Sequence, residues 1–434
     1  MKFFFHLFQL AALTLMSAKA DNTPNLCTDD IAYLEKIRPS ETVTDGHSIP
    51  NITIGGFTYL GDSHHFVVNP TTGGGQHEKI IVYIPGTTDR PALSSCLIKS
   101  MSETLSFPVL ALSYQYLSSG DKFRNGKCEL LVNGDDRDEQ INCLKQQHVD
   151  AIDGGNYGAT HFKSDGTTAF WTEVLPENSL TRRLGDLLIH LDQKYPDGHW
   201  STFLQEDMET PAWENIIFSG HNAGAGHAAY LAQTKNINGA VMISGPQDEC
   251  IGCPEGTSFW IDEPYTSSPD TPYTVFAHGS EPLFSVTENN WKSMKTANPD
   301  INWVTTDPQS TGFGLETTPD DAHASPLFTN VEHANTSTCG GKENCSVAID
   351  DSVPYIKLVD SEKLYLYEVT VWPSILKAAS SQPSSAPSSN PSESPSVEPS
   401  TNPSESLSES PSTAPSSQPI SAPCVNTKKG KNLK

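Results

Sequence analysis

The residues best placed to do chemistry lie in one short turn, Gly220-His221-Asn222-Ala223-Gly224. The β-branched and aromatic run Ile216–Phe218 before it is typical of a buried strand, and the small residues of Ala223–Ala232 are typical of a tightly packed helix. Glycines in such a turn let strand and helix approach closely and present the central residue to a site. The turn predicts a functional position at Asn222, with an ordinary strand-to-helix turn as the alternative, since short glycine motifs recur by chance.

Asn222 stands where a turn of this form carries a nucleophile. Asn is among the few non-glycine residues that tolerate a positive φ at low cost, so we expect the strained geometry to persist. An amide has no hydroxyl that a histidine could deprotonate, which closes the serine acyl-enzyme route. The sequence therefore predicts the shape of a nucleophile turn without its nucleophile.

Apolar runs alternate with helical patterns on both sides of this turn. Continuous apolar runs predict buried parallel strands, and leucines on one helical face predict an amphipathic helix. The predicted strands are Lys79–Ile84, Pro108–Leu112, Glu214–Ser219, Gly239–Ile243, Tyr273–Ala277 and Ile301–Thr305, and the predicted helices are Thr181–Leu191, Ala223–Ala232 and Leu364–Lys377. This alternation predicts an α/β fold with a mostly parallel central sheet flanked by helices, and with ligands at the carboxyl ends of the strands.

The segment Leu117–Glu177 fits this alternation badly, because it is polar, glycine-rich and bears cysteines. We expect an insertion or lid on the substrate side, with a structural loop as the alternative. It lies within a predicted body of residues 21–379, which is long for one domain but acceptable for an α/β protein with insertions.

The first twenty residues, Met1–Ala20, combine a lysine, an apolar stretch and a small-residue end. This pattern predicts a secretory signal peptide, and no later run is long enough for a transmembrane helix. Eight of the nine cysteines lie in the body, which predicts four disulfides in an exported chain. The simplest pairs are Cys128/Cys143, Cys250/Cys253, Cys339/Cys345 and Cys27/Cys96, although sequence alone does not fix them, and N-glycosylation sequons begin at Asn51, Asn335 and Asn344.

The last part of the chain, residues 380–434, changes character completely. Between Ser380 and Pro423, prolines recur at every fourth position, with one exception, and serine dominates between them. A segment of this composition cannot bury a core, so we expect a disordered, extended tail. It resembles the Pro-Ser repeats attached to secreted or wall-associated proteins of some microalgae.

The formal net charge is −25, and acids and lysines cancel within the tail, so the acidic excess belongs to the body. Nucleic acid and anionic membranes are therefore poor partners. Simple solubility outside the cell explains the charge more readily than a specific cationic ligand does. We expect no cofactor and no metal ion.

The GHNAGAGHAAYLA stretch at 220–232, the IPGTTDRP loop at 84–91 and the order of the predicted strands together resemble secreted α/β-hydrolases of the lipase/esterase type. The likeness is greatest to a bacterial and algal group that carries GHSxGAGHAAYLA, and it covers roughly residues 75–330. It implies an α/β-hydrolase fold and a small-molecule ester-like ligand. This chain departs from the motif at Asn222, where the group has serine.

The resemblance also implies positions for the rest of an active site. In this fold the oxyanion hole uses the backbone N–H after the nucleophile and one from an earlier loop, which assigns Ala223 and Thr87. The order nucleophile, acid, histidine makes Glu281 the candidate acid, with Asp248 as its rival. His323, taken to follow the last core strand, is the candidate base, and His333 is the alternative.

Two hypotheses of different classes follow from these residues. In the first, the chain is a pseudoenzyme that keeps its pocket but has lost its nucleophile, and it serves as a binding module or attaches to a cell wall or matrix. In the second, it is an active ester hydrolase that uses a deamidated Asn222 or a nearby hydroxyl such as Thr87 or Ser244. A single-codon error in the sequence would restore an ordinary serine esterase. We favour the pseudoenzyme.

Overall fold

A computed structural model of the chain describes residues 34–114, 137–155, 174–249, 259–303, 315–317, 327–331 and 347–380, apart from gaps of one to six residues inside these ranges. Several predicted features lie outside the described residues and stay predictions. They are the signal peptide, the tail beyond Ser380, Thr87, His323, His333, the three sequons, most of the cysteines and the insertion apart from residues 137–155 and 174–177.

One mixed sheet of ten strands forms the centre of the protein, in the order β1-β4-β6-β5-β7-β8-β9-β12-β11, with β10 also paired to β9. Strands β6, β5, β7, β8, β9 and β12 are mutually parallel, whereas β1, β4 and β11 run antiparallel to their neighbours. The strands are β1 (Leu34–Ile37), β4 (His65–Val68), β5 (Ile80–Ile84), β6 (Val109–Ala111), β7 (Ile216–His221), β8 (Gly239–Ile243), β9 (Pro272–His278), β10 (Asn302–Trp303), β11 (Leu315–Thr317) and β12 (Leu327–Thr329).

The strand order identifies the fold. Leaving aside the short β10 and β11, the third and fourth strands of the sheet along the chain, β5 and β6, have exchanged places, and the second, β4, is antiparallel. This is the order of the α/β-hydrolase fold, in which the strand–turn–helix carrying the nucleophile follows the fifth strand. The fifth strand is β7, and the turn at Asn222 follows it directly.

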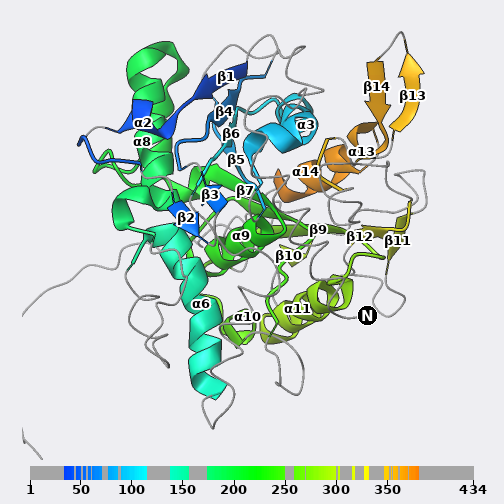
Figure 1. Ribbon diagram of the computed structural model, residues 1–434. Helices are drawn as coiled ribbons and strands as arrows, with labels where there is room; N and C mark the ends of the chain where they lie inside the picture. Colours follow the sequence, from blue (N-terminus) through cyan, green and yellow to red (C-terminus); the bar gives the residue numbers. More distant parts are fainter. Residues whose placement is uncertain are drawn as a thin grey trace, which may run out of the picture. The chain divides into compact units, whose positions relative to one another are not determined.

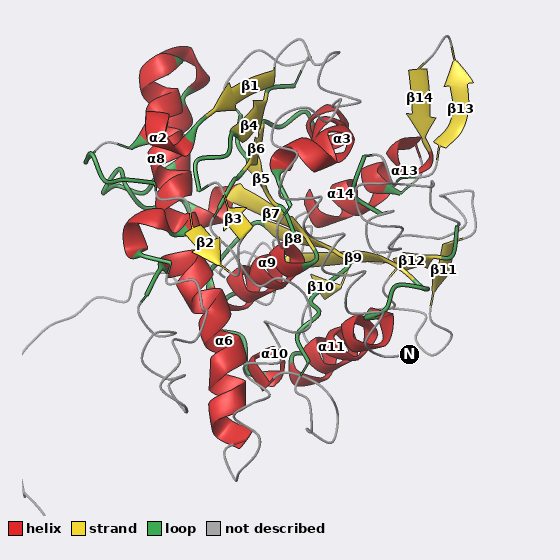
Figure 2. Ribbon diagram, viewed as in Figure 1, coloured by secondary structure: helices red, strands yellow, loops and turns green. Residues whose placement is uncertain are grey.

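Helices cover both faces of the sheet, as Figures 1 and 2 show. Alternate residues of β5 divide between two buried cores: Ile80, Val82 and Ile84 face one, and Ile81 and Tyr83 face the other. The first core is closed by α6 (Arg137–Asp153), α8 (Leu180–Lys194), α9 (Ala223–Thr234), α10 (Phe259–Asp262) and α11 (Phe284–Ala297), and the second by α3 (Ser95–Leu105), α13 (Leu366–Val369) and α14 (Trp372–Ser380). The other described elements are a short helix α2 (Pro39–Thr42), several 3-10 turns and two hairpins, β2 (Ile52–Ile54) with β3 (Phe57–Tyr59) and β13 (Tyr355–Val359) with β14 (Glu362–Tyr365).

Most predicted elements are confirmed, and the start of one helix is wrong. Strands β5 to β9 and helices α8 and α9 lie where the sequence predicts them. The predicted closing helix Leu364–Lys377 begins too early, because β14 and α13 occupy its first part and α14 starts at Trp372. Within the predicted strand Ile301–Thr305, the described residues Asn302–Trp303 form β10. Part of the predicted insertion is α6, which packs against α8 and α9 in the body.

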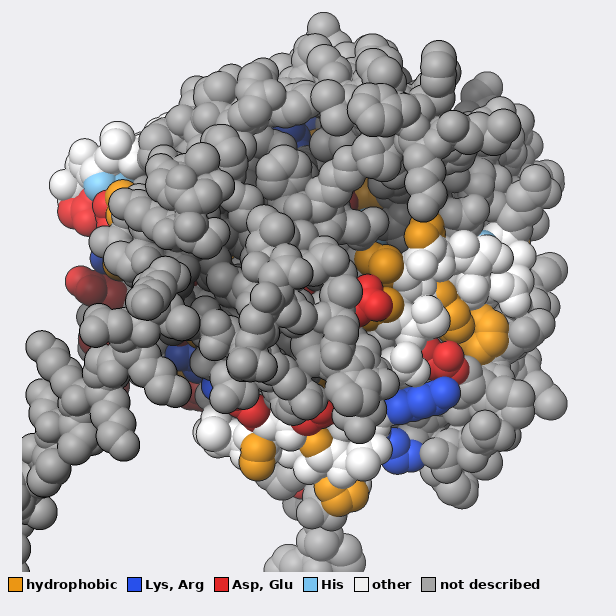
Figure 3. Space-filling model, turned by 60° about the horizontal axis from the view of Figure 1, so that its bottom comes forward, with side chains coloured by type: hydrophobic (Ala, Val, Ile, Leu, Met, Phe, Trp, Pro, Cys, Tyr) orange, Lys and Arg blue, Asp and Glu red, His pale blue; other side chains and the backbone are white. Residues whose placement is uncertain are grey.

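No helix among the described residues is long and apolar enough to span a membrane. On the face shown in Figure 3, acidic side chains lie scattered among polar and apolar ones, and the few Lys and Arg side chains form only small groups. The described surface of this face therefore has no broad basic patch of the kind that nucleic acid requires.

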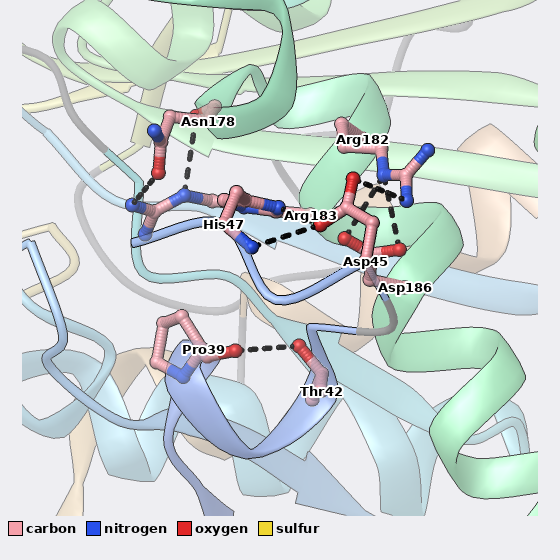
Figure 4. A network of polar contacts seen from close by, with 8 residues as sticks. All are labelled: Pro39, Thr42, Asp45, His47, Asn178, Arg182, Arg183 and Asp186. Carbon is pink, nitrogen blue, oxygen red and sulfur yellow. Dashed lines mark hydrogen bonds and ion pairs between the residues drawn. The ribbon is translucent and has the colours of Figure 1, made fainter. Parts of the chain in front are cut away.

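A buried arginine ties the start of α8 to the loops at one end of the sheet (Figure 4). Arg183 is 2% exposed, and its guanidinium donates hydrogen bonds to the carbonyl oxygens of Gly61, Ser113 and Asn178 at 2.9–3.1 Å. Burial lowers the pKa of Arg183 to about 10. This side chain supplies hydrogen bonds to three carbonyl oxygens in the protein interior, where polar groups need partners.

Arg183→Met should therefore destabilise the protein strongly, by roughly 3–5 kcal/mol, because it leaves buried carbonyls without donors. Urea unfolding measures the loss. Arg38→Met is the matched control: the Arg38 side chain is 44% exposed and lies 3.9 Å from Asp62. A surface pair of this kind contributes about 1 kcal/mol or less. Equal effects of the two substitutions would contradict the role assigned to Arg183.

The described body ends at α14, which is anchored in the second core. Trp372 is fully buried and donates from Nε1 to the carbonyl oxygen of Val347 at 3.1 Å. Removal of residues 387–434 should leave the melting temperature of the body unchanged, because a Pro/Ser-rich segment has no core to lose. Truncation before Trp372 should prevent folding, since it removes several buried side chains. Thermal unfolding followed by circular dichroism distinguishes these outcomes, and a fall of several degrees without residues 387–434 would refute the first.

Candidate active site

The turn after β7 has the geometry of a nucleophile elbow. Asn222 adopts φ 53° and ψ −114° between the last residue of β7, His221, and the first of α9, Ala223. This ψ lies far from the left-handed region near +45°, which Asn tolerates. The expected positive φ is present, but the preference of asparagine for the left-handed region does not explain this ψ. The surrounding structure imposes the conformation.

Those surroundings are backbone groups in close contact. The Asn222 N–H donates to the carbonyl oxygen of Ile243 at 2.8 Å, and the Asn222 carbonyl accepts from the N–H groups of Ala225 and Gly226 at 3.0 and 3.3 Å. A Cβ on Gly220 would lie 2.1 Å from the carbonyl oxygen of Gly224. A Cβ on Gly224 would lie 2.0 Å from that of Ile84, so only glycine fits where α9 crosses the end of β5. The turn is held from β8, α9 and β5 at once.

The loop after β5 runs directly beside Asn222. A Cβ built on Gly86 would lie 3.1 Å from Cβ of Asn222 and 3.2 Å from Nδ1 of His221. Asp89 fixes the far side of this loop, because its Oδ2 lies 3.2 Å from the same nitrogen of His221. Thr87, the predicted oxyanion donor, lies outside the described residues, but its neighbour Gly86 is at the elbow. The N–H of Ala223, the other predicted donor, is at the N-terminus of α9, where the macrodipole favours negative charge.

Glu281, the predicted acid, is connected to the elbow through Ser244 and Gly245. It follows β9, is 4% exposed, and accepts a hydrogen bond from Ser244 Oγ at 2.7 Å through Oε2. Ser244 directly follows β8, and the next residue, Gly245, packs on the elbow: a Cβ there would lie 2.6 Å from the carbonyl oxygen of Asn222. The Glu281 carboxylate is therefore connected to the turn through two residues, Ser244 and Gly245.

Asp248, the rival acid, belongs to a different cluster. Its Oδ2 lies 2.6 Å from Nε2 of His148 and accepts from Nε1 of Trp260 at 2.7 Å. His148 comes from α6, stacks on Tyr230 of α9, and its Nδ1 lies 2.9 Å from Nδ1 of His227. The three ionisable side chains of this cluster, Asp248, His148 and His227, are at most 2% exposed. Asp248 therefore connects the loop after β8 to α6 and α10, and His148 in turn contacts α9 through His227.

The sequence reasoning missed this histidine cluster. His227 lies in the helix motif after the turn, and its position on the buried face could have indicated a buried histidine. His148 lies in the predicted insertion, where nothing in the sequence indicated its role. Among the described residues, no group of three or more His, Cys, Asp or Glu side chains is arranged to hold a metal ion.

The sheet contains one strand that the sequence analysis did not predict, and this strand affects the choice of the base. His323 was assigned because it follows Ile301–Thr305, taken as the last core strand. The structure has a further strand, β12, which pairs in parallel with the carboxyl-terminal half of β9, Thr329 opposite His278. His323 precedes β12 in the chain and His333 follows it, although both lie outside the described residues.

The chain after β12 lies against the turn that carries Glu281. The N–H of Gly279 donates to the carbonyl oxygen of Thr329 at 2.8 Å, and Nε2 of His278 donates to that of Val331 at 2.9 Å. His333 is two residues beyond Val331 in the sequence. Since the fold places its histidine after the last parallel strand, this order favours His333 over His323 as the residue that completes the site.

Neither a family description nor a curated protein sequence matches the chain. Solved structures that resemble it include a hyperthermophilic esterase from the archaeon Pyrobaculum calidifontis, 13% identical with a TM-score of 0.30, over 70% of this chain and 82% of that one. Carboxyl esterase 2 from the fungus Tuber melanosporum is 10% identical with a TM-score of 0.31, over 68% and 85%. A thermostable carboxylesterase cloned from a metagenomic library is 14% identical with a TM-score of 0.28, over 69% and 83%. At this level of similarity the fold assignment rests on the strand order.

Gly224→Ala should disrupt the elbow, at a cost of roughly 2–4 kcal/mol, because the new methyl meets the backbone of Ile84. Gly226→Ala is the matched control on the same helix, where the nearest atom is Cε1 of the His148 side chain, at 2.9 Å, rather than backbone. Each Gly→Ala change gains about 1 kcal/mol from helix propensity. The difference in stability between the two variants therefore reports the contact between the new methyl and the backbone of Ile84. Thermal unfolding of the two variants provides the comparison, and equal stabilities would contradict the packing described.

Proposed function

We propose that this protein is a secreted α/β-hydrolase-fold relative of esterases that has lost its serine nucleophile and binds a small ester-like ligand. The observation that carries the proposal is the coexistence of a strained elbow with an amide at its centre. A backbone in a sparsely populated region costs roughly 1–3 kcal/mol and persists where surrounding structure enforces it. Asn222 retains that conformation although its side chain cannot attack a carbonyl carbon.

The remaining groups support binding at the elbow. The Ala223 N–H and the loop at Gly86 lie where an oxyanion hole belongs, and Glu281 is buried beside Ser244. Asn222 is half-buried, so its side chain is within reach of a ligand. A ligand that carries a carbonyl or carboxylate oxygen fits the positive end of α9.

Attachment to a cell wall or matrix is part of the same proposal. The predicted signal peptide and the Pro/Ser-rich tail support it, because an extended tail on an exported domain suits a stalk. The predicted disulfides and glycosylation fit the same compartment.

An active hydrolase is the second candidate, and one observation limits it. Ser244 is fully buried and donates its hydroxyl to Glu281, so no substrate carbonyl can reach it without rearrangement of β8 and β9. Thr87 lies outside the described residues. Of the two described candidates, Ser244 and a deamidated Asn222, the second is therefore favoured.

The unmodified protein should show no covalent labelling by a fluorophosphonate serine probe, and Asn222→Ser should restore labelling together with hydrolysis of short-chain esters. Oxyanion donors alone can leave roughly a thousandfold rate over water, so weak turnover by the unmodified protein is expected. Strong labelling of the unmodified protein would refute the loss of the nucleophile.

The base can be assigned in the Asn222→Ser background. His333→Ala should abolish the restored labelling, and His323→Ala should spare it, because only His333 follows β12. The melting temperature of each variant shows whether the protein still folds. The opposite pattern would return the role to His323, and no restoration in a folded Asn222→Ser protein would show that the other catalytic groups have also been lost.

A further inference from the structure

The elbow holds Asn222 in a backbone conformation that is rare for asparagine and that favours reaction of its own side chain. We propose that Asn222 is a self-modification site, at which the main-chain nitrogen of Ala223 attacks the side-chain amide and the ring then opens to aspartate. The proposal concerns the chemical state of residue 222 and does not depend on the ligand or on the identity of the base.

The geometric step follows from ψ. Viewed along the Cα–C bond, Cβ is offset from the backbone nitrogen by about 120° on a tetrahedral carbon. At the observed ψ of −114°, Cβ of Asn222 therefore almost eclipses the nitrogen of Ala223. A five-membered ring through Cα, Cβ, Cγ, the carbonyl carbon and that nitrogen is nearly flat and requires this eclipsed arrangement. The ψ values of helices and strands, near −42° and +115 to +135°, turn Cβ well away from the next nitrogen.

The attacking nitrogen is also available. Ala223 is the first residue of α9, and no described residue accepts a hydrogen bond from its N–H. Asn222 makes no side-chain cap on the helix, so its amide group is not committed to another contact there. The N-terminus of a helix stabilises negative charge, which favours the deprotonated nitrogen that reacts. The half-buried side chain remains accessible to water.

The chemistry balances with water as the only other reactant. A hydroxide or water molecule takes the proton from the Ala223 nitrogen, whose lone pair forms a bond to Cγ of Asn222. The bond from Cγ to the side-chain nitrogen breaks, ammonia leaves with the proton, and a cyclic imide remains. Water then adds to one imide carbonyl. Cleavage of the bond from Cγ to nitrogen gives aspartate, and cleavage at the main-chain carbonyl gives isoaspartate.

The packing of the elbow selects between these two products. Isoaspartate inserts an extra carbon into the main chain at residue 222. The adjacent backbone has no room for this extra carbon. A Cβ built on Gly224 or on Gly245 would lie only 2.0 or 2.6 Å from a backbone carbonyl oxygen. Ring opening to aspartate restores the original backbone and the N–H of Ala223. The expected product is a carboxylate at the nucleophile position of an intact elbow.

The chain contains its own comparator, Asn238-Gly239. In an unfolded chain this pair reacts faster than Asn222-Ala223, because glycine puts no side chain in the way of the attack and leaves the backbone free. In the fold the order should reverse. Asn238 is 8% exposed, its N–H donates to the carbonyl oxygen of Ile216, its Nδ2 donates to that of Glu214, and Gly239 begins β8.

The test is a time course on the full-length folded protein at mildly alkaline pH, read by peptide mapping under acidic conditions. The imide form of a peptide is about 17 Da lighter and the aspartate form about 1 Da heavier than the original. The Asn222 peptide should convert roughly tenfold or more faster than the Asn238 peptide, because its backbone already holds Cβ eclipsed with the attacking nitrogen. The same measurement in concentrated urea should show the Asn238 peptide converting first.

Asn222→Gln is the matched control, because a glutamine at this position must close a six-membered ring and loses the alignment. Its elbow peptide should keep its mass over the same time, with an unchanged melting temperature. If Asn222 stays intact in the folded protein, reacts more slowly than Asn238, or converts equally fast in urea, the proposal is wrong. These masses are independent of serine-probe labelling in Asn222→Ser, so failure of one proposal leaves the other standing.

Discussion

The packing of four backbone segments around residue 222 is the constraint on which the rest of the site depends. Strand β7 reaches the end of the sheet, α9 starts immediately, and the two glycines Gly220 and Gly224 bring α9 against β7 and β5. No residue type other than glycine prefers the dihedral angles found at Asn222, so the strain is maintained by hydrogen bonds to Ile243, Ala225 and Gly226. A side-chain substitution at this position therefore changes the chemistry of the turn without relaxing its shape.

The same packing explains how the two candidate acids are separated. A buried carboxylate needs hydrogen-bond donors, and each of these has found different ones. Asp248 lies against His148 of α6 and Trp260 of α10. Glu281 accepts a hydrogen bond from Ser244, the residue before Gly245, whose backbone packs on Asn222. The two candidate acids therefore have different partners, and Glu281 is the one connected to the turn through Ser244 and Gly245.

Sequence patterns predicted the centre of the sheet because β5, β7, β8 and β9 are buried on both faces and read as continuous apolar runs. Strand β12 has only three residues, Leu-Phe-Thr, and helix α6 is largely polar, so neither has a period that local reasoning could find. The start of α14 could have been predicted from the sequence, because Pro373 lies in its first turn. A proline inside the predicted helix Leu364–Lys377 indicates a helix boundary. The omission of β12 made His323 the residue expected after the last core strand, whereas His333 is the one that follows β12 in the sequence.

The chemical capacity of the elbow finally depends on one functional group. With an amide at residue 222, the site offers hydrogen-bond donors and a helix dipole but nothing that can form a covalent bond to a substrate. With a carboxylate, the same backbone would present a nucleophile beside the Ala223 N–H, and the charge would sit at the favourable end of α9. The hydroxyl of Ser244 is buried and bonded to Glu281, so Ser244 offers no route around position 222. The proposed binding role and a catalytic role therefore differ in the side chain of residue 222, within the same α/β-hydrolase-fold backbone.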